Sequence, residues 1–151
     1  MDYLFDIDGT LLDITHRLKF LSGPPKDWKS FRDPDLKRLD APIMPTIEIM
    51  KSLRVAGHNS IIVSARIKDE LDVTKDSLSK WVPDIDDIPM YLRSNKDYRK
   101  DKVVKAMLLE KIRADGYDPV MVFDDRPSVI NMWHETGLLV ADMRDPSKGD
   151  F

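Results

Sequence analysis

Two pairs of aspartates stand where the chain can concentrate negative charge. Asp6 and Asp8 lie in the string Phe-Asp-Ile-Asp-Gly-Thr, and Asp124 and Asp125 directly follow a later apolar run. Gly9 permits a sharp turn, so both carboxylates of the first pair can converge on one point. Gathered carboxylates repel one another unless a cation is bound, and oxygen ligands without His or Cys suit Mg²⁺. The spacing therefore predicts a Mg²⁺ site with all four aspartates as its ligands.

Each pair also has an ordinary structural explanation. Asp-Gly is a common turn, and Asp125 is well placed to cap a helix that begins at Pro127. Either pair alone is as consistent with these roles as with a metal site. Two such pairs, one opening the chain and one near its end, favour the site.

Phosphate-binding groups follow other predicted elements. Ser64, Ala65 and Arg66 come directly after an apolar run, where a hydroxyl and backbone N–H groups can hold a phosphate oxygen. A serine that caps the next helix is the alternative. Lys105 lies one turn into a predicted helix that opens near Asp101. Alone it would be a solvated lysine, but beside four acids it is a candidate cation for a phosphate or an acyl phosphate.

The elements that would position these residues alternate between short apolar runs and helical patterns, which is typical of a parallel α/β sheet. In such a sheet the C-terminal strand ends share one edge, so the acids and Ser64 can meet there. We expect an α/β fold with a central, mostly parallel sheet. The expected strands are 3–7, 60–64, 88–92, 120–123 and 138–141, and the expected helices are 45–56, 68–82, 101–113 and 127–136.

The segment from about 13 to 41 does not fit this alternation. It contains Pro24-Pro25, Trp28, Phe31 and Pro34, and we expect a small helical insertion after the first strand. An insertion there lies over the C-terminal edge of the sheet, where open α/β sheets bind ligands, so it is a candidate lid. Trp28 and Phe31 are expected to form the lid core; stacking on a nucleic-acid base is the alternative.

Composition limits the class of protein. The chain has 151 residues, the size of one domain, with 24 Lys+Arg against 27 Asp+Glu and a net charge of −3. This balance argues against a broad basic face for duplex nucleic acid. The absence of Cys excludes disulfides, thiolate nucleophiles and Cys-bound metals. No apolar run reaches the roughly 18 residues of a membrane span, and the first residues do not resemble a signal peptide, so we expect a cytoplasmic protein without a membrane partner.

The order of the motifs resembles the haloacid dehalogenase (HAD) superfamily of phosphohydrolases. The match runs nearly end to end and is nearest to the 3′-phosphatase domain of phage polynucleotide kinase/phosphatase. Arg17, nine residues after Asp8, matches a substrate-contacting arginine of that family. Two departures are Ala65, where the family usually has Gly, and a longer insertion at 13–41. The shared strings are Asp6-x-Asp8-Gly9-Thr10, Ser64-Ala65-Arg66, Arg99-Lys100-Asp101, Val103-Val104-Lys105, Asp124-Asp125-Arg126, Met132-Trp133 and Gly149-Asp150-Phe151.

The resemblance implies a fold and a mechanism. The fold would be one three-layer, doubly wound (Rossmann-like HAD) domain over 1–151, with a cap at about 13–41. Asp6 would attack phosphorus and form an aspartyl phosphate, and Asp8 would act as general acid and base. Mg²⁺ would be held by Asp6, the Asp8 carbonyl and Asp125, with help from Asp124.

The resemblance also implies a cradle for the phosphate. Thr10, Ser64, Lys105 and the backbone at Ala65 would contact it, and Asp101 would orient Lys105. Arg17, Arg66 and Arg126 would grip the substrate; their alternative is ion pairing with the acids of the site, above all for Arg126. His16, His58 and His134 have no partner at motif spacing and are expected to be surface or boundary residues.

The function implied is removal of a 3′-phosphate from DNA or RNA ends. The alternative is the same chemistry on free nucleotides, a 5′-nucleotidase. The chain has no G-x-x-x-x-G-K-[ST] loop, so a kinase or ligase would be a separate partner; a phage-encoded enzyme in the host cytoplasm fits this. A receiver-type signalling domain has a different order of acids and lysine, and an inactive binding module would lack Asp6 or Asp8.

Overall fold

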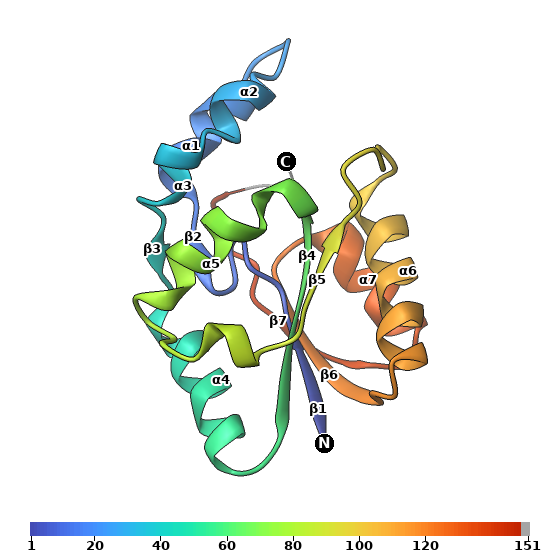
Figure 1. Ribbon diagram of the computed structural model, residues 1–151. Coiled ribbons are helices and arrows are strands. Elements are labelled where there is room, and N and C mark those ends of the chain that lie inside the picture. Colours follow the sequence, from blue (N-terminus) through green and yellow to red (C-terminus); the bar gives the residue numbers. More distant parts are fainter. Residues whose placement is uncertain (149–151) are drawn as a thin grey trace.

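A five-stranded, wholly parallel sheet forms the centre of the computed structural model, which describes residues 1–148 (Figure 1). The string Gly149-Asp150-Phe151 therefore lies outside the described residues. The strand order is β5-β4-β1-β6-β7, so the chain reverses its direction of winding at β1. The strands are β1 (Asp2–Phe5), β4 (Asn59–Ile67), β5 (Met90–Arg93), β6 (Pro119–Asp124) and β7 (Leu139–Asp142).

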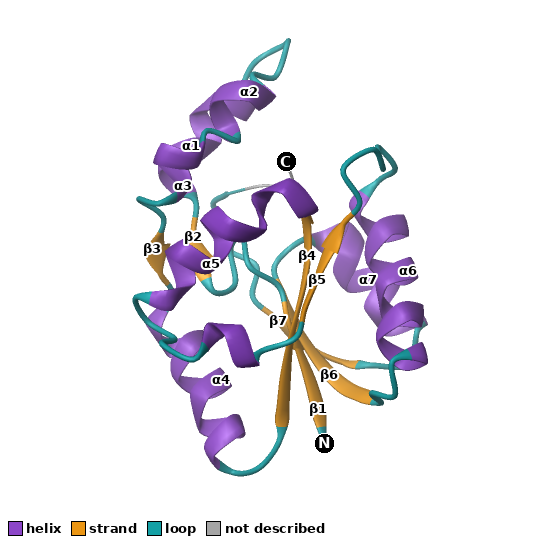
Figure 2. Ribbon diagram, in the orientation of Figure 1, coloured by secondary structure: helices purple, strands orange, loops and turns teal. Residues whose placement is uncertain are grey.

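Helices cover both faces of this sheet, as expected for the predicted α/β class (Figure 2). On one face α4 (Met44–Val55) and α5 (Leu71–Ser79) pack on residues such as Phe5 and Ile62. On the other, α6 (Asp101–Ala114) and α7 (Pro127–Glu135) pack on Leu4 and Val122. The strands are apolar on both sides because both faces are buried.

Two predicted elements differ in extent. The second strand continues past its expected end at 64 as far as Ile67, with a register shift against β5 after Ser64. The helix expected at 68–82 is divided into a 3₁₀ turn, η2 (Lys68–Glu70), and α5, which ends at Ser79. The Glu70 side chain accepts the N–H of Ile67 at 2.9 Å, and this bond stabilises the tight turn. A second 3₁₀ turn, η3 (Ile85–Asp87), precedes β5.

The predicted insertion is a helical projection beyond the C-terminal edge of the sheet (Figure 1, upper left). Its two ends are held together by an antiparallel pair, β2 (Leu12–Asp13) with β3 (Ala41–Pro42). Between them lie α1 (Thr15–Leu18), η1 (Lys19–Leu21), α2 (Trp28–Phe31) and α3 (Pro34–Lys37). We call residues 14–40 the cap.

The cap has a small core of its own, formed by Ile14, Leu21 and Phe31. Phe31 is 9% exposed, in agreement with the expected lid core, but Trp28 is 43% exposed. Half of that expectation is therefore wrong: Trp28 contacts Phe31 only at its edge, with ring centroids 5.9 Å apart and planes at 88°. Among residues 1–148, no helix has the length and apolar character needed to cross a membrane.

Candidate active site

One cavity opens at the C-terminal edge of the sheet, between the cap and the strand ends. Asp6 follows β1, Ser64 lies near the end of β4 and Asp125 follows β6, and all three line this cavity. These strands are neighbours on either side of the point where the winding reverses, which leaves a crevice above β1. The predicted motifs therefore meet because of the sheet topology.

Three of the four predicted metal ligands form an acidic cluster. Asp6, Asp124 and Asp125 each offer a carboxylate oxygen, and these oxygens lie within 4.8 Å of one another. Gly9 makes this approach possible: it has a φ of +82°, and a Cβ at this position would overlap the Asp125 carboxylate. The Asp125 carboxylate is therefore part of the cluster. It does not cap α7, because the N-cap residue of that helix is Arg126.

Asp124 is the most firmly held member of the cluster. Its Oδ2 accepts hydrogen bonds from Lys105 Nζ at 2.7 Å and from Trp133 Nε1 at 3.0 Å, and its Oδ1 accepts the Arg126 N–H at 3.2 Å. The side chain is completely buried. Trp133, on α7, is a supporting residue that sequence reasoning did not assign to the site.

Lys105 is the cation of the cluster. Its Nζ lies 2.8 Å from Asp6 and 2.7 Å from Asp124. Burial by itself would lower the pKa of Lys105, but the two adjacent carboxylates raise it above the ordinary value. Lys105 is thus a permanent positive charge beside Asp6, as its predicted role requires.

The carboxylates of this cluster remain in excess over the lysine. Burial, together with repulsion from the neighbouring aspartates, raises the pKa of Asp6 well above its ordinary value. Burial and the charge of Asp124 raise the pKa of Asp125 to about 7. A divalent cation would relieve this repulsion, and a set of three carboxylates without His or Cys fits Mg²⁺.

Asp8 has the opposite environment, because guanidinium groups surround its carboxylate and it is not one of the three clustered acids. Arg66 donates to it from Nη2 at 2.5 Å and from Nε at 3.1 Å, and Arg17 Nη2 lies at 3.5 Å. Burial alone would raise the pKa of Asp8, but the Arg66 guanidinium lowers it well below the ordinary range. The carboxylate of Asp8 is therefore separate from the predicted metal ligands, and only its backbone carbonyl remains a candidate for that role.

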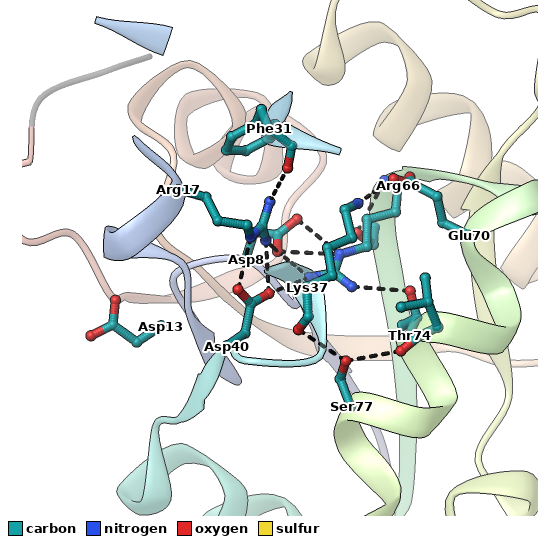
Figure 3. A network of polar contacts seen from close by, with 12 residues as sticks. Asp8, Asp13, Arg17, Phe31, Lys37, Asp40, Arg66, Glu70, Thr74 and Ser77 are labelled. Atoms are coloured by element: carbon teal, nitrogen blue, oxygen red, sulfur yellow. Dashed lines mark hydrogen bonds and ion pairs between the residues drawn. The ribbon is translucent and has the colours of Figure 1, made fainter. Parts of the chain in front are cut away.

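A buried ionic network lies under the cap and holds these arginines (Figure 3). Arg17 is fully buried and donates to Asp40 from Nε at 2.8 Å and from Nη2 at 2.7 Å. Arg66 Nη2 also reaches Asp40, at 3.2 Å, and Arg66 Nη1 donates to Thr74 at 3.0 Å. His16 is exposed as predicted, yet it has a partner, since its Nε2 lies 2.8 Å from Asp40 Oδ1.

The remaining predicted residues line the cavity rim. Ser64 Oγ accepts the Arg66 N–H at 3.2 Å and lies within β4, so it does not cap a helix. Arg93, at the end of β5, donates to the Ala65 carbonyl at 3.0 Å and to Asp101 at 2.5 Å. Asp101 also pairs with Arg126. The prediction that Asp101 orients Lys105 is wrong in this structure, because these arginines occupy Asp101 while Lys105 contacts Asp6 and Asp124.

The three predicted substrate arginines are all in ion pairs with acids of the site. Arg66 and Arg126 also line the cavity, whereas within residues 1–148 Arg17 is not part of its lining. Thr10 is fully buried, is likewise not part of the lining, and its Oγ1 has no hydrogen-bond partner among the described residues. Contact of Arg17 or Thr10 with substrate stays a prediction.

Comparison with known proteins decides the family. The pattern of the family described as "Polynucleotide kinase PNKP phosphatase domain" matches residues 2–151. The chain belongs to this family. It is thus a HAD-type phosphatase related to polynucleotide kinase/phosphatase, as the motifs predicted.

Individual relatives are consistent with this family assignment. A protein of Autographa californica nuclear polyhedrosis virus, provisionally named a bifunctional polynucleotide kinase/RNA ligase, is 31% identical over 134 residues, which are 87% of this chain and 17% of the viral protein. Two chains from structures of a Pnkp1/Rnl/Hen1 complex match with TM-scores of 0.79 and 0.75, at 24% and 27% identity. Each match covers 99% of this chain but 47% and 43% of the other, so the phosphatase spans less than half of these relatives.

A more distant neighbour shares the fold. The D,D-heptose 1.7-bisphosphate phosphatase of B. bronchiseptica, complexed with magnesium and phosphate, has a TM-score of 0.62 at 12% identity. The match covers 93% of the phosphatase and 79% of that chain, and at this identity it shows the shared fold.

Several residues of the site were not predicted. Arg93 stands at the C-terminal end of a predicted strand, so the rule that identified Ser64 could also have found it. Asp40 and the buried pair of Lys37 with Glu70 carried no such signal, because two of these residues lie in the irregular insertion. Their partners come from distant parts of the chain, and only the folded structure brings them together.

Proposed function

We propose that the phosphatase removes 3′-phosphates from polynucleotide ends, depends on Mg²⁺ and proceeds through an aspartyl phosphate on Asp6. The observation that carries this proposal is the cluster of Asp6, Asp124 and Asp125 around Lys105, at the strand ends of a domain from the polynucleotide kinase phosphatase family. The names of the viral relative and of the Pnkp1/Rnl/Hen1 complex support a nucleic-acid substrate.

The acidic cluster would hold the metal. Asp6, the Asp8 carbonyl and Asp125 are the proposed ligands, with help from Asp124. When bound, Mg²⁺ supplies positive charge that offsets the repulsion between the carboxylates and the phosphate oxygens. Lys105 supplies part of the same charge from within the protein.

Two displacement steps follow from the residue types. A carboxylate oxygen of Asp6 attacks phosphorus, the bond from phosphorus to the 3′ oxygen breaks, and Asp8 donates a proton to that oxygen. Asp8 then accepts a proton from water as the water oxygen attacks the phosphoryl group. The bond between phosphorus and Asp6 breaks, and inorganic phosphate and the free carboxylate are released.

Asp8 must exchange charged partners in the first step. Without substrate it is held ionised by Arg66, which also lines the cavity. A phosphate group in the cavity would compete with Asp8 for that guanidinium and so favour the protonated carboxyl. In the second step the ionised form is the one required, and Arg66 stabilises it.

Further cations and donors would complete the phosphate cradle. Ser64, the backbone at Ala65, Lys105, Arg66, Arg93 and Arg126 all line the cavity. Thr10 and Arg17 would join only if substrate binding changes their surroundings.

A 5′-nucleotidase is the second candidate, because apolar cap residues at the cavity would suit a free nucleoside equally well. Phosphate release from a 3′-phosphorylated oligonucleotide should be compared with release from nucleoside 3′- and 5′-monophosphates, each with Mg²⁺. We expect the highest kcat/KM for the oligonucleotide, and loss of activity in excess EDTA. Faster turnover of 5′-monophosphates would establish the nucleotidase instead.

The wider setting is proposed from the relatives. A kinase or ligase activity would accompany the phosphatase, in a longer polypeptide or a separate chain. From the viral relative we also propose a phage or viral gene. Action of its product in the host cytoplasm stays a prediction.

A further inference from the structure

The cavity has two chemically different sides. Its floor carries the acidic cluster and its cations, whereas the cap contributes an apolar wall. This wall is formed by Ile14, Leu21, Phe31 and Trp28, and Arg32 lies beside them in the lining. A phosphate needs only the floor, so the apolar wall is suited to the group that carries the phosphate.

Trp28 is the member of this wall whose packing is incomplete. Ile14, Leu21 and Phe31 form the cap core and are at most 9% exposed, but Trp28 is 43% exposed. Its indole meets Phe31 only at an edge. The position is nevertheless fixed, because Trp28 opens α2, whose first turn is capped by the Asp27 side chain through the Ser30 N–H at 3.0 Å.

Two cations lie over the indole. Arg32 Cζ is 5.5 Å and Lys26 Nζ is 5.6 Å from the ring centroid. At an exposed site such contacts are weak, about 0.5–1 kcal/mol each, so a ligand can displace them. A ring that stacks on Trp28 would also find positive charge beside it for a neighbouring anionic group.

These features specify one kind of ligand: a flat aromatic ring, connected to the phosphate on the floor and next to a further negative charge. A nucleotide at the end of a polynucleotide has all three parts, since its base is planar and its 5′ side bears a phosphodiester. A sugar phosphate lacks the ring, and a mononucleotide with only a 3′-phosphate lacks the second charge.

We propose that Trp28 stacks on the base of the 3′-terminal nucleotide while Arg32 contacts the phosphodiester on its 5′ side. This inference rests on the proposed 3′-phosphatase function and adds to it a specificity-determining site in the cap. Stacking is tolerant of base identity, because every base has a π face. The cap therefore selects for a nucleotide end without reading its sequence.

The experiment compares two substrates that differ only in the terminal base. One is a 3′-phosphorylated oligonucleotide, and the other carries a tetrahydrofuran abasic residue at its 3′ end with the same phosphate. The quantity measured is the ratio of kcat/KM for the base-containing substrate to kcat/KM for the abasic substrate. A base stack predicts a ratio of about five or more in the wild type.

Two substitutions at Trp28 and one at Trp81 test whether the indole of Trp28 causes the difference in kcat/KM between the two substrates. Trp28→Leu keeps an apolar side chain on Phe31 but removes the stacking face, so the ratio should fall to about one. Trp28→Phe retains a smaller ring and should give an intermediate ratio. Trp81→Leu is the matched control, because Trp81 is 37% exposed but lies outside the cavity lining; it should keep the wild-type ratio.

The outcomes separate this inference from the function on which it rests. Turnover of both substrates with a ratio near one in the wild type, or the same high ratio in Trp28→Leu, overturns base stacking and leaves the 3′-phosphatase intact. If neither substrate is turned over, the proposed function is overturned and this inference with it.

A binding measurement covers the case in which Trp28→Leu fails to fold. An oligonucleotide with 2-aminopurine at its phosphorylated 3′ end is added to full-length protein carrying Asp6→Asn. Stacking on Trp28 quenches the 2-aminopurine fluorescence, and Trp28→Phe in the same background should weaken the quenching. Binding without quenching would contradict the proposal.

Discussion

Asp6 and Asp8, the two aspartates of the first motif, have opposite electrostatic surroundings. Asp6 lies among other carboxylates and beside one lysine, whereas Asp8 lies between two guanidinium groups. The pKa of Asp6 is accordingly raised and that of Asp8 lowered. A bound cation would lower the pKa of Asp6 and leave it ionised as the nucleophile, whereas a phosphate that takes Arg66 from Asp8 would raise the pKa of Asp8 toward that of a proton donor.

Replacing Asp6 by Asn should remove the nucleophile while leaving its shape. We expect phosphate release to fall by at least about 1,000-fold, the scale seen when a covalent nucleophile is lost. The Tm should change little, because Lys105 keeps its contact with Asp124. Steady-state kinetics and thermal unfolding check both points; substantial residual turnover by a folded Asp6→Asn protein would exclude Asp6 as the nucleophile.

Mg²⁺ binding should depend on pH through Asp125. Its pKa of about 7 means that protons compete with the metal below neutrality. We expect the apparent affinity for Mg²⁺ to rise by about tenfold between pH 6 and pH 8, since the ligand must be deprotonated. Calorimetric titration measures this, and Asp125→Asn should flatten the profile; a pH-independent affinity in the wild type would contradict it.

The stability of the metal-free protein should follow the same group. Because folding raises the pKa of Asp125, its contribution to stability is present at acidic pH and is lost as the pH rises through about 7. Added Mg²⁺ should remove this loss, because it binds the deprotonated form of the folded protein.

The motif residues were predictable because strand ends and short spacing identify them, and Gly9 could be assigned to a turn for the same reason. Asp40 was not predictable. Its partners, Arg17 and Arg66, stand 23 and 26 residues away on different elements. Nothing in the local pattern marks a carboxylate that is buried only because the cap packs against the sheet domain.

At the scale of elements, the cap is joined to the sheet domain by ionic contacts as well as by the β2–β3 pair. Lys37 on α3 pairs with Glu70 on η2, and Ser77 Oγ on α5 donates to the Lys37 carbonyl at 3.1 Å. Arg17 and Arg66 both reach Asp40 at the base of the cap. The base of the cap is therefore fixed beside Asp8, and any closure over substrate would have to occur nearer its tip.

Asp40→Asn should destabilise the protein strongly, because it leaves buried guanidinium groups without their full counter-charge. Loss of one partner of a buried ion pair costs about 3–5 kcal/mol of unfolding free energy. Asp35→Asn, in the same cap but 92% exposed at its side chain, is the matched control and should change stability little. Urea unfolding compares the two; equal effects would mean that the network does not stabilise the cap.

The main strands and helices were predictable because apolar periodicity and helix-end signals are strong in segments of this length. The cap was recognised only as an irregular helical insertion. Its α-helices, α1, α2 and α3, have four residues each, too short for a periodic pattern. Trp28 was assigned to the wrong environment for the same reason, since only the path of the cap decides which aromatic is buried and which stays partly exposed.

In the whole molecule, the net charge of −3 does not describe the charge of the residues that line the cavity. Among the described residues, the cavity lining contains six cationic side chains, four of them the arginines Arg32, Arg66, Arg93 and Arg126, against five acids, so its charge is nearly balanced. Much of this positive charge is paired with acids of the site. The distribution favours capture of one phosphorylated end over extended binding of a strand.

The affinity for an oligonucleotide should depend only weakly on salt concentration if the enzyme contacts few phosphates. For single strands the slope of log affinity against log salt is about −0.7 for each phosphate contact, so two contacts predict a roughly sevenfold loss between 50 and 200 mM salt. We expect KM for a 3′-phosphorylated oligonucleotide to rise by about this factor. A loss of about 1,000-fold, which would require many contacts, would contradict capture of the end alone.

One oligonucleotide that carries a phosphate at both its 5′ and its 3′ end tests directly which of the two the phosphatase removes. After incubation with the phosphatase and Mg²⁺, fragment mass spectrometry locates the phosphate that remains. We expect that the 3′-phosphate is lost and the 5′-phosphate is kept. Loss of the 5′-phosphate, or retention of both by folded and metal-loaded protein, would contradict it.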